Sequence, residues 1–546
     1  MKKLFLFVFT ILILLSFVSS GNAGIIGTQV NLGQYTVIAW NDLGMHCIDH
    51  DYSVFAILPP FNNLHAQVID RYTGTLVSSG VIVTYRAARD TDGSINTTSI
   101  GKTNFWNFVL PLFGVQLPQD TGLTGNPVQS RTPAPMIFNP TYGYWEADGI
   151  PVVPYNNNDN HNYYPMVRVE VKGQDGSTLA VTKTVLPVSD EIRCRSCHIS
   201  KTGDPAAQPS TGWINDPNLD KDWKRNILKL HDERNISNPT YAVALSTNGY
   251  SSTGLLDTAD NINPILCANC HASNALGKAG INGVNPLTEA IHSWHGLNVM
   301  DDNTGLPLDN TMNKSACYYC HPGSQTKCLR GVMGKAKDAK GKSLLQCQSC
   351  HGSMSKVGAP GRAGWMDLPS CQHCHYQSDT TGTYVRDTSV FDPSGNYRQV
   401  TSIFTPGPSL YKVSAGGHGN MQCEACHGST HAEYATSEAN DNVQSITLQG
   451  HKGTIAECSV CHRSFSLPIT KDGGPHGLHT IGQAWVNNHH SFAEANLTQC
   501  ATCHGNNYRG TILSKTFTGR TFTTKDSGLK RYVKGTKVSC YDCHNG

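Results

Sequence analysis

One arrangement of cysteine and histidine recurs along most of the chain after residue 193, and it is densest between Cys347 and His375. This segment begins with Cys-Gln-Ser-Cys-His and ends with Cys-Gln-His-Cys-His. In Cys-x-x-Cys-His, the two thiols can add to the two vinyl groups of one porphyrin, and the histidine supplies a nitrogen ligand to its iron. The spacing therefore predicts covalent attachment of c-type haem, with two haems close together at this segment.

The same pattern occurs nine times and uses eighteen of the twenty cysteines. Zinc ribbons and redox dithiols also contain cysteine pairs, but neither requires a histidine directly after the second cysteine. All nine pairs have one, although only 24 of the 546 residues are histidine. We therefore expect nine c-type haems as cofactors. The thioether cysteines are expected to be Cys194, Cys197, Cys267, Cys270, Cys317, Cys320, Cys347, Cys350, Cys371, Cys374, Cys423, Cys426, Cys458, Cys461, Cys500, Cys503, Cys540 and Cys543. The proximal iron ligands are expected to be His198, His271, His321, His351, His375, His427, His462, His504 and His544.

The remaining fifteen histidines include enough candidates to give every iron a second axial ligand. Iron with two histidine ligands has no open position, so it exchanges electrons at the haem edge and does not bind substrate at the metal. A lone histidine can equally be a surface or core residue, and methionine ligation is a weaker alternative because the chain has only ten methionines. The candidate distal ligands are His231, His292, His295, His373, His418, His431, His451, His476, His479, His489 and His490, together with His46 and His50 from the N-terminal region.

Two cysteines, Cys47 and Cys328, lie outside the motifs. Two remaining thiols in an exported protein pair most simply as a disulfide, which here would tie the N-terminal region to the loop after the third motif. Two alternatives stay open. Both thiols could be free, or the segment with Met45, His46, Cys47, Asp49, His50 and Asp51 could form a small metal site.

The chain begins with the pattern of a secretory signal peptide. Lys2 and Lys3 precede an apolar run from Leu4 to Val18, and small residues from Gly21 to Ala23 form a cleavage site. We expect removal of residues 1–23 and export to the periplasm, the outer cell surface or the extracellular space; the alternative is an uncleaved membrane anchor. No later stretch is apolar for long enough to cross a bilayer, and the formal charge of +2 includes no strong basic patch for nucleic acid.

Residues 24–190 carry no haem motif and predict a β-rich, sandwich-like domain. β-branched, partly alternating segments start near residues 35, 65, 80, 165 and 178, and polar turns separate them. The stretch from Gly101 to Asn162 is rich in proline, glycine and asparagine, which predicts long structured loops. Residues 191–546 predict a loop-rich, sparsely helical region organised by haem packing, with a helix at Asp220–Arg234 and a subdivision near 377–414.

On these nine motifs, the chain resembles the multihaem c-type cytochromes of bacteria and archaea that respire on extracellular electron acceptors. The resemblance covers residues 193–546 and implies a row of haems that passes single electrons to other redox proteins or to an extracellular acceptor. It also implies that a head-to-tail homopolymer is an arrangement to test, because the ninth motif ends two residues before the end of the sequence. The alternative is a multihaem oxidoreductase with one open haem that acts on a nitrogen or sulfur compound.

Overall fold

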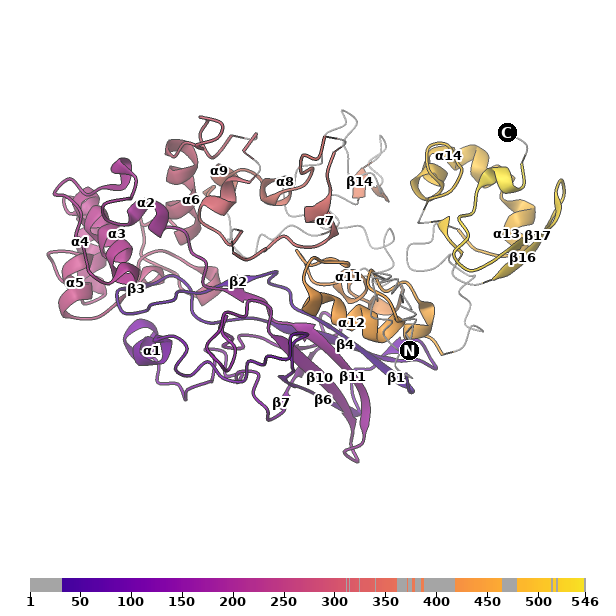
Figure 1. Ribbon diagram of the computed structural model, residues 1–546, viewed down its shortest axis with the longest axis horizontal. Coiled ribbons are helices and arrows are strands. Elements are labelled where there is room, and N and C mark those ends of the chain that lie inside the picture. The colour runs from indigo at the N-terminus through magenta and orange to yellow at the C-terminus, as the bar shows by residue number, and fades with distance from the viewer. Residues whose placement is uncertain are drawn as a thin grey trace, which may run out of the picture.

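The computed structural model describes residues 32–360 except 311, 314, 324 and 339, then 371, 376–378, 384–386, 418–463, and 479–544 except 512–513 and 517–518. The predicted signal peptide and most of the predicted break at 377–414 lie outside these residues. Within the described part, strands dominate up to residue 189 and short helices dominate after it (Figure 1).

Two antiparallel sheets form the N-terminal region. The first has the order β1-β4-β9-β8, with β5 paired to β4, and the second has the order β11-β10-β6-β7. Their strands are β1 (Tyr35–Trp40), β4 (Leu64–Asp70), β5 (Thr75–Leu76), β8 (Ile137–Asn139), β9 (Tyr144–Ala147), β6 (Val81–Ala87), β7 (Ala134–Pro135), β10 (Met166–Gly173) and β11 (Thr178–Val185). The expected strand-rich region is confirmed, and all five segments singled out by their alternation are strands.

The alternation of side chains along β1 and β4 decides which residues face the core between the sheets. Val37 and Ala39 of β1 join a cluster that also contains Val83 of β6 and Val169 of β10. Their neighbours Ile38 and Trp40 point to the opposite face, since successive residues of a strand alternate. The first sheet is therefore apolar on both faces, which requires a second layer of chain on its outer side.

The prediction of loops between Gly101 and Asn162 is wrong in part, because this stretch holds helix α1 (Phe105–Phe113) and the β8–β9 hairpin. Phe105, Val109 and Leu112 recur at helical spacing and are buried, and the helix ends at Gly114 in the left-handed conformation. The apolar helical face was hidden by Pro111, which lies inside the helix.

Helices and single turns separated by loops follow the sheets. Helix α3 (Leu219–Asn235) matches the predicted helix, and the side chain of Asn218 caps it by accepting from two backbone N–H groups. The other elements up to residue 386 are β2 (His46–Cys47), β3 (Phe55–Ala56), β12 (Val188–Ser189), α2 (Arg195–His198), η1 (Pro205–Ala207), α4 (Pro239–Thr247), α5 (Leu255–Asn261), β13 (Ile265–Leu266), η2 (Cys267–Asn269), η3 (Asn274–Leu276), α6 (Leu287–Asn298), η4 (Ala316–Tyr319), α7 (Val332–Lys335), α8 (Cys347–His351), α9 (Met354–Val357), β14 (Tyr376–Ser378) and β15 (Tyr384–Arg386).

The second layer on β1 and β4 is supplied by residues 418–463. This segment contains η6 (His418–Asn420), α11 (Cys423–His427), α12 (Ala439–Gln449) and η7 (Cys458–Val460). Its residues Ala425 and Leu448 pack with Trp40 in one buried cluster. The buried amide of Gln444 accepts from the Ala39 N–H and donates to the Ala39 carbonyl, both at 2.8 Å. The segment that contains the sixth and seventh motifs is therefore held against the sheet by both apolar packing and hydrogen bonds.

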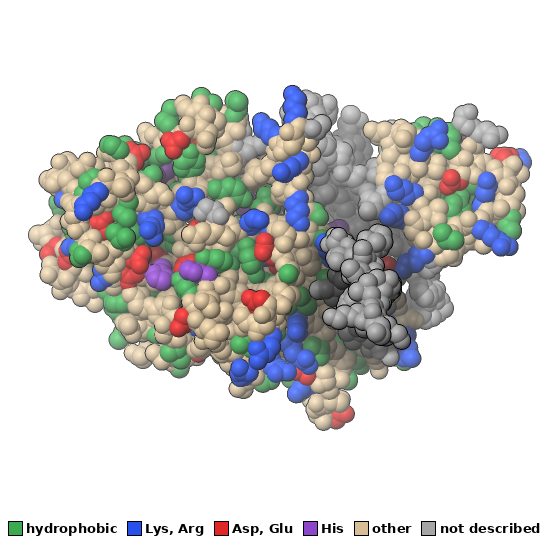
Figure 2. Space-filling view, viewed as in Figure 1, with side chains coloured by type: hydrophobic (Ala, Val, Ile, Leu, Met, Phe, Trp, Pro, Cys, Tyr) green, Lys and Arg blue, Asp and Glu red, His purple; other side chains and the backbone are tan. Residues whose placement is uncertain are grey.

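Residues 479–544 form the C-terminal lobe, at the right end of the long axis in Figure 1. It contains α13 (Gln483–Asn488), α14 (His490–His504), β16 (Arg520–Thr524), β17 (Gly528–Tyr532) and η9 (Cys540–Asp542). Figure 2 shows charges of both signs interspersed over the visible face, with Lys and Arg gathered over the lower middle. Among the described residues, no helix combines the length and the apolar character that crossing a membrane requires.

Candidate functional site

Each Cys-x-x-Cys-His motif that the structure describes in full lies in a helical turn. In the first, third and ninth motifs, the histidine N–H donates to the carbonyl of the first cysteine, at 3.1, 2.8 and 3.0 Å respectively. Residues three and four apart lie on the same side of a helix. One turn therefore presents both thiols and the imidazole to the same side, as attachment to one planar group requires.

These turns all face one continuous cavity of about 4310 Å³. Its wall includes the two cysteines and the histidine of each of the eight fully described motifs, and also Cys371 of the fifth motif. A ninth of this volume is about 480 Å³, within the range of about 300–1,000 Å³ for a pocket that holds one small molecule or cofactor. Cys374 and His375 of the fifth motif lie outside the described residues.

Five motif histidines face a second histidine across this cavity. An imidazole nitrogen binds a metal at about 2.0–2.1 Å, so two axial rings on one ion have centres about 6 Å apart. The ring centres in the five pairs are 6.4, 6.1, 6.0, 6.0 and 5.6 Å apart, which matches this spacing. In this order, the pairs are His271 with His231, His321 with His292, His351 with His431, His462 with His418, and His544 with His489.

Two further pairs are indicated by electrostatic contact. Helix α6 carries both His292 and His295, and His295 lies close enough to His198 to help lower its pKa. His504 acts in the same way on His479. One helix thus presents histidines to the first and the third motif.

Hydrogen bonds at the other ring nitrogen fix the orientation of several of these imidazoles. Nδ1 lies 2.7 Å from the carbonyl of Asn285 in His271 and 2.9 Å from the carbonyl of Val538 in His504. His292, His295, His479 and His489 make similar contacts. A carbonyl only accepts, so Nδ1 carries the proton and Nε2 keeps its lone pair. Metal-binding histidines commonly have this arrangement.

Burial favours the neutral imidazole at several of these histidines and the thiol at several of these cysteines. It lowers the pKa of His321 to about 4, and the neighbouring His292 adds to this effect. Burial likewise lowers the pKa of His198 and His231 to about 4, with smaller contributions from nearby histidines. Neutral imidazole is the form that binds metal. Burial raises the pKa of Cys426 to about 12, so this cysteine is a thiol at neutral pH, unlike a cysteine of a preformed thiolate site.

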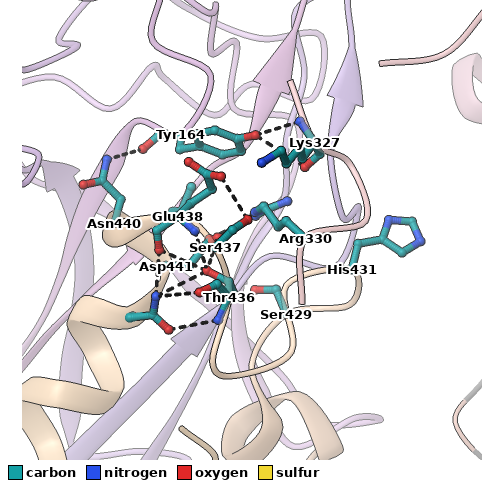
Figure 3. Close-up of polar contacts among 12 residues, drawn as sticks. Tyr164, Lys327, Arg330, Ser429, His431, Thr436, Ser437, Glu438, Asn440 and Asp441 are labelled. Carbon is teal, nitrogen blue, oxygen red and sulfur yellow. Dashed lines mark hydrogen bonds and ion pairs between the residues drawn. The ribbon is translucent and has the colours of Figure 1, made fainter. Parts of the chain in front are cut away.

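His431 is held by a polar network that the motif analysis did not reveal (Figure 3). Its carbonyl accepts from the N–H groups of Arg330 and Gly331, both at 2.8 Å. The Arg330 side chain is fully buried, donates to both carboxylate oxygens of Asp441 at 2.6 and 3.0 Å, and packs on the ring of Tyr164. The network joins the loop after the third motif to α12 and to the sheet region. This network could not be predicted from the sequence, because nothing near Arg330 indicates that its partner is Asp441.

The other candidate distal ligands are placed differently. His490 is exposed, 3.2 Å from Glu494, and His451 is half-exposed near Glu457 at the cavity wall. His46 donates from Nε2 to the carbonyl of Pro59. His50 bonds the hydroxyl of Tyr155 and lies 3.5 Å from Asp190. His373 and His476 lie outside the described residues.

The structure does not contain the expected disulfide, because Cys47 and Cys328 are both free thiols. They are neighbours, since Cys328 adds to the burial effect that raises the pKa of Cys47. The sulfur of Cys328 lies 3.2 Å from Nδ1 of His431.

The alternative of a small metal site around Cys47 is wrong, because its ligand atoms do not converge. Asp49 is fully buried and paired with Lys224 Nζ at 2.7 Å. Asp51 accepts from Ser53 and Asn104. In the part of the chain described, three side chains able to share one metal ion meet elsewhere, at His65, Glu146 and Asp148.

Comparison with known proteins gives no relative for this chain, since no family model, no curated protein and no solved structure matches it significantly.

Proposed function

We propose that this protein is an exported multihaem c-type cytochrome that conducts electrons through nine covalently bound haems. The residues that would hold the haems are the cysteines and histidines of the nine motifs, with the paired histidines as second axial ligands. Haem supplies the one-electron chemistry, and the chain supplies attachment, axial ligands and a buried environment. In this proposal, haem packing organises the region after residue 190.

One observation carries the proposal: motif histidines face second histidines at the spacing of two axial rings, in one cavity lined by every fully described motif. A set of zinc ribbons would bring cysteine pairs together around each ion. Among the described residues, the group able to share one metal contains no cysteine at all. Paired imidazoles favour electron transfer over substrate binding at the metal.

The arrangement of the motifs suits a conduit. Helices α2, α8, α11 and α14 follow one another along the long axis of the molecule (Figure 1). The segments that lead into the first and seventh motifs contact other motifs, since the Arg193 N–H donates to the carbonyl of Cys320 and the Ile455 N–H to that of Cys426. Attached groups would therefore also be neighbours.

The last pair, His489 and His544, lines the end of the motif-lined cavity. His489 and His544 are 3.4 Å apart at Nε2, and His544 is exposed at the far end of the row. An exposed terminal haem would give electrons an exit to a soluble partner, an extracellular acceptor or a second copy of the chain.

Spectroscopy of the protein from a host with cytochrome c maturation tests the function. If every iron has two histidine ligands, the ferric protein is low-spin and the ferrous protein binds almost no carbon monoxide. A stoichiometric high-spin signal with carbon monoxide binding would instead support the oxidoreductase. Protein without covalently bound haem would refute both.

A further inference from the structure

The outer face of the first sheet carries a cluster of metal-binding side chains that belong to no Cys-x-x-Cys-His motif and lie at the edge of the motif-lined cavity, whose wall includes Asp42. We name Asp42, His65, Glu146 and Asp148 the imidazole–carboxylate cluster. His65 Nε2 lies 3.5 Å from Asp148 Oδ1 and 3.8 Å from Asp42 Oδ2. One ligand atom each of His65, Glu146 and Asp148 lies within 4.8 Å of the others.

The strand register brings these residues together. His65 on β4 is directly opposite Trp40 on β1 and Glu146 on β9, and opposite residues of paired strands share a face. Asp42 and Asp148 lie two residues beyond these partners, which returns them to the same face if the strand alternation continues. Three neighbouring strands, β1, β4 and β9, and the residues that follow β1 and β9 therefore supply four possible ligands at one end of the sheet.

The 3.5 Å between His65 Nε2 and Asp148 Oδ1 is close to the separation of two ligands on one ion and longer than an ordinary hydrogen bond. An N–H···O bond spans about 2.7–3.2 Å. Two atoms bound tetrahedrally to one ion at about 2.0–2.2 Å lie about 3.3–3.6 Å apart. The His65 side chain is only 6% exposed, and its Nε2 makes a long contact of 3.5 Å with Asp148 and lies 3.8 Å from Asp42. Its ring is held in place by stacking on Tyr144, with centres 4.2 Å apart.

The carboxylates are only partly satisfied by hydrogen bonds within the protein. Glu146 accepts from Asn139 at 3.0 Å and Asp42 accepts from Asn63 at 3.5 Å. In the described part of the chain, no Lys or Arg makes an ion pair with Asp42, Glu146 or Asp148. Oδ1 of Asp42 and Oδ1 of Asp148 are buried atoms without a hydrogen-bond partner. These two buried oxygens and the His65 nitrogen leave ligand atoms on one side of the cluster that a cation could use.

We propose that the imidazole–carboxylate cluster binds one divalent transition-metal ion, with His65 as its nitrogen ligand and the carboxylates as its oxygen ligands. The imidazole favours zinc-like ions over calcium and magnesium, which prefer oxygen ligands alone. Asp42 and Asp148 are 38% and 43% exposed, so the ion can enter from solvent. The proposal does not depend on haem. The bound ion would join the loop after β1 to the end of β9, next to the Gln67–Gln422 contact with the sixth motif.

Zinc binding to the full-length exported protein tests the site. After treatment with EDTA, titration calorimetry with zinc should detect one tight equivalent. Asp148→Asn and Glu146→Gln should each weaken it by about 100-fold or more, beyond the effect of typical outer-shell changes. His490→Gln is the matched control, because this exposed histidine also lies beside a carboxylate and should leave the tight equivalent unchanged.

X-ray absorption at the zinc edge of the wild-type protein provides a test that does not require the variants to fold. One imidazole with oxygen ligands is expected. Absence of a tight equivalent, unchanged affinity in folded Asp148→Asn and Glu146→Gln proteins, or a zinc shell with sulfur or several imidazoles would overturn the proposal. A far-UV circular dichroism spectrum like that of the wild type would show that each variant is folded.

Discussion

Removal of the Arg330 guanidinium should both destabilise the fold and release His431. Arg330 is completely buried, and Asp441 is 5% exposed on the side chain. In Arg330→Met, the Asp441 carboxylate would be buried without its cation, and the carbonyls of Gly44 and Cys328 would lose a donor. Breaking a buried pair from one side costs about 3–5 kcal/mol, so we expect a loss of this size in unfolding free energy.

Guanidinium denaturation, followed by far-UV circular dichroism, measures this loss. The matched control is Lys534→Met, because Lys534 pairs with Glu457 at the surface and should cost about 0–1 kcal/mol. The double variant Arg330→Met with Asp441→Leu should recover most of the loss, since an apolar pair leaves no unpaired charge. A second readout is ferric spin state, where Arg330→Met should add a high-spin fraction from the fourth motif. The reasoning fails if Arg330→Met stays within about 1 kcal/mol of the wild type or if the double variant is no better than the single one.

Three further predictions follow from the site. The hydrogen bond to Asp190 raises the pKa of His50, so protonated His50 stabilises the fold fully below the unfolded pKa of about 6.5, and this stabilisation disappears as pH rises through the raised pKa. His50→Gln should therefore lower the unfolding free energy at pH 5.5 but not at pH 9. An equal loss at both pH values would exclude this charge effect. Cys47 and Cys328 should both be alkylated without reductant once the protein is unfolded, and one cross-linked peptide between them would restore the disulfide expected from sequence. His292→Gly should convert one haem to high-spin and make it bind carbon monoxide, whereas the same change at exposed His490 should leave the spectrum unchanged, and a low-spin His292→Gly spectrum would remove this histidine from the ligands.

Local patterns in the sequence were enough to predict the elements whose residues alternate or recur regularly. Strands β4, β6, β10 and β11 and helix α3 lie where the sequence placed them, within a residue or two. Each has its own apolar face, so its period is visible in a short window. Helix α1 was missed because proline inside it obscured the period, and the short helices α4 and α5 were missed in a segment judged mostly loop.

Which histidines face each other could not be predicted, because the pairing depends on contacts far apart in the chain. His431 reaches His351 only because Arg330 and Asp441, which are 111 residues apart, hold its loop. The imidazole–carboxylate cluster depends in the same way on the register of three strands. The spacing within each motif was enough to select its cysteines and histidine. The disulfide between Cys47 and Cys328 was expected only because these two cysteines lie outside the motifs, and that count gives no information on the direction of either side chain.

The central claim is that nine haems are attached to the nine motifs. The mass of the intact mature protein, purified under denaturing conditions from a host that attaches haem, tests this claim most directly. We predict the polypeptide from about Gly24 plus nine porphyrins, and loss of one porphyrin mass when Cys347 and Cys350 are both replaced by alanine. A mass equal to the bare polypeptide, or one with markedly fewer porphyrins, would contradict the account.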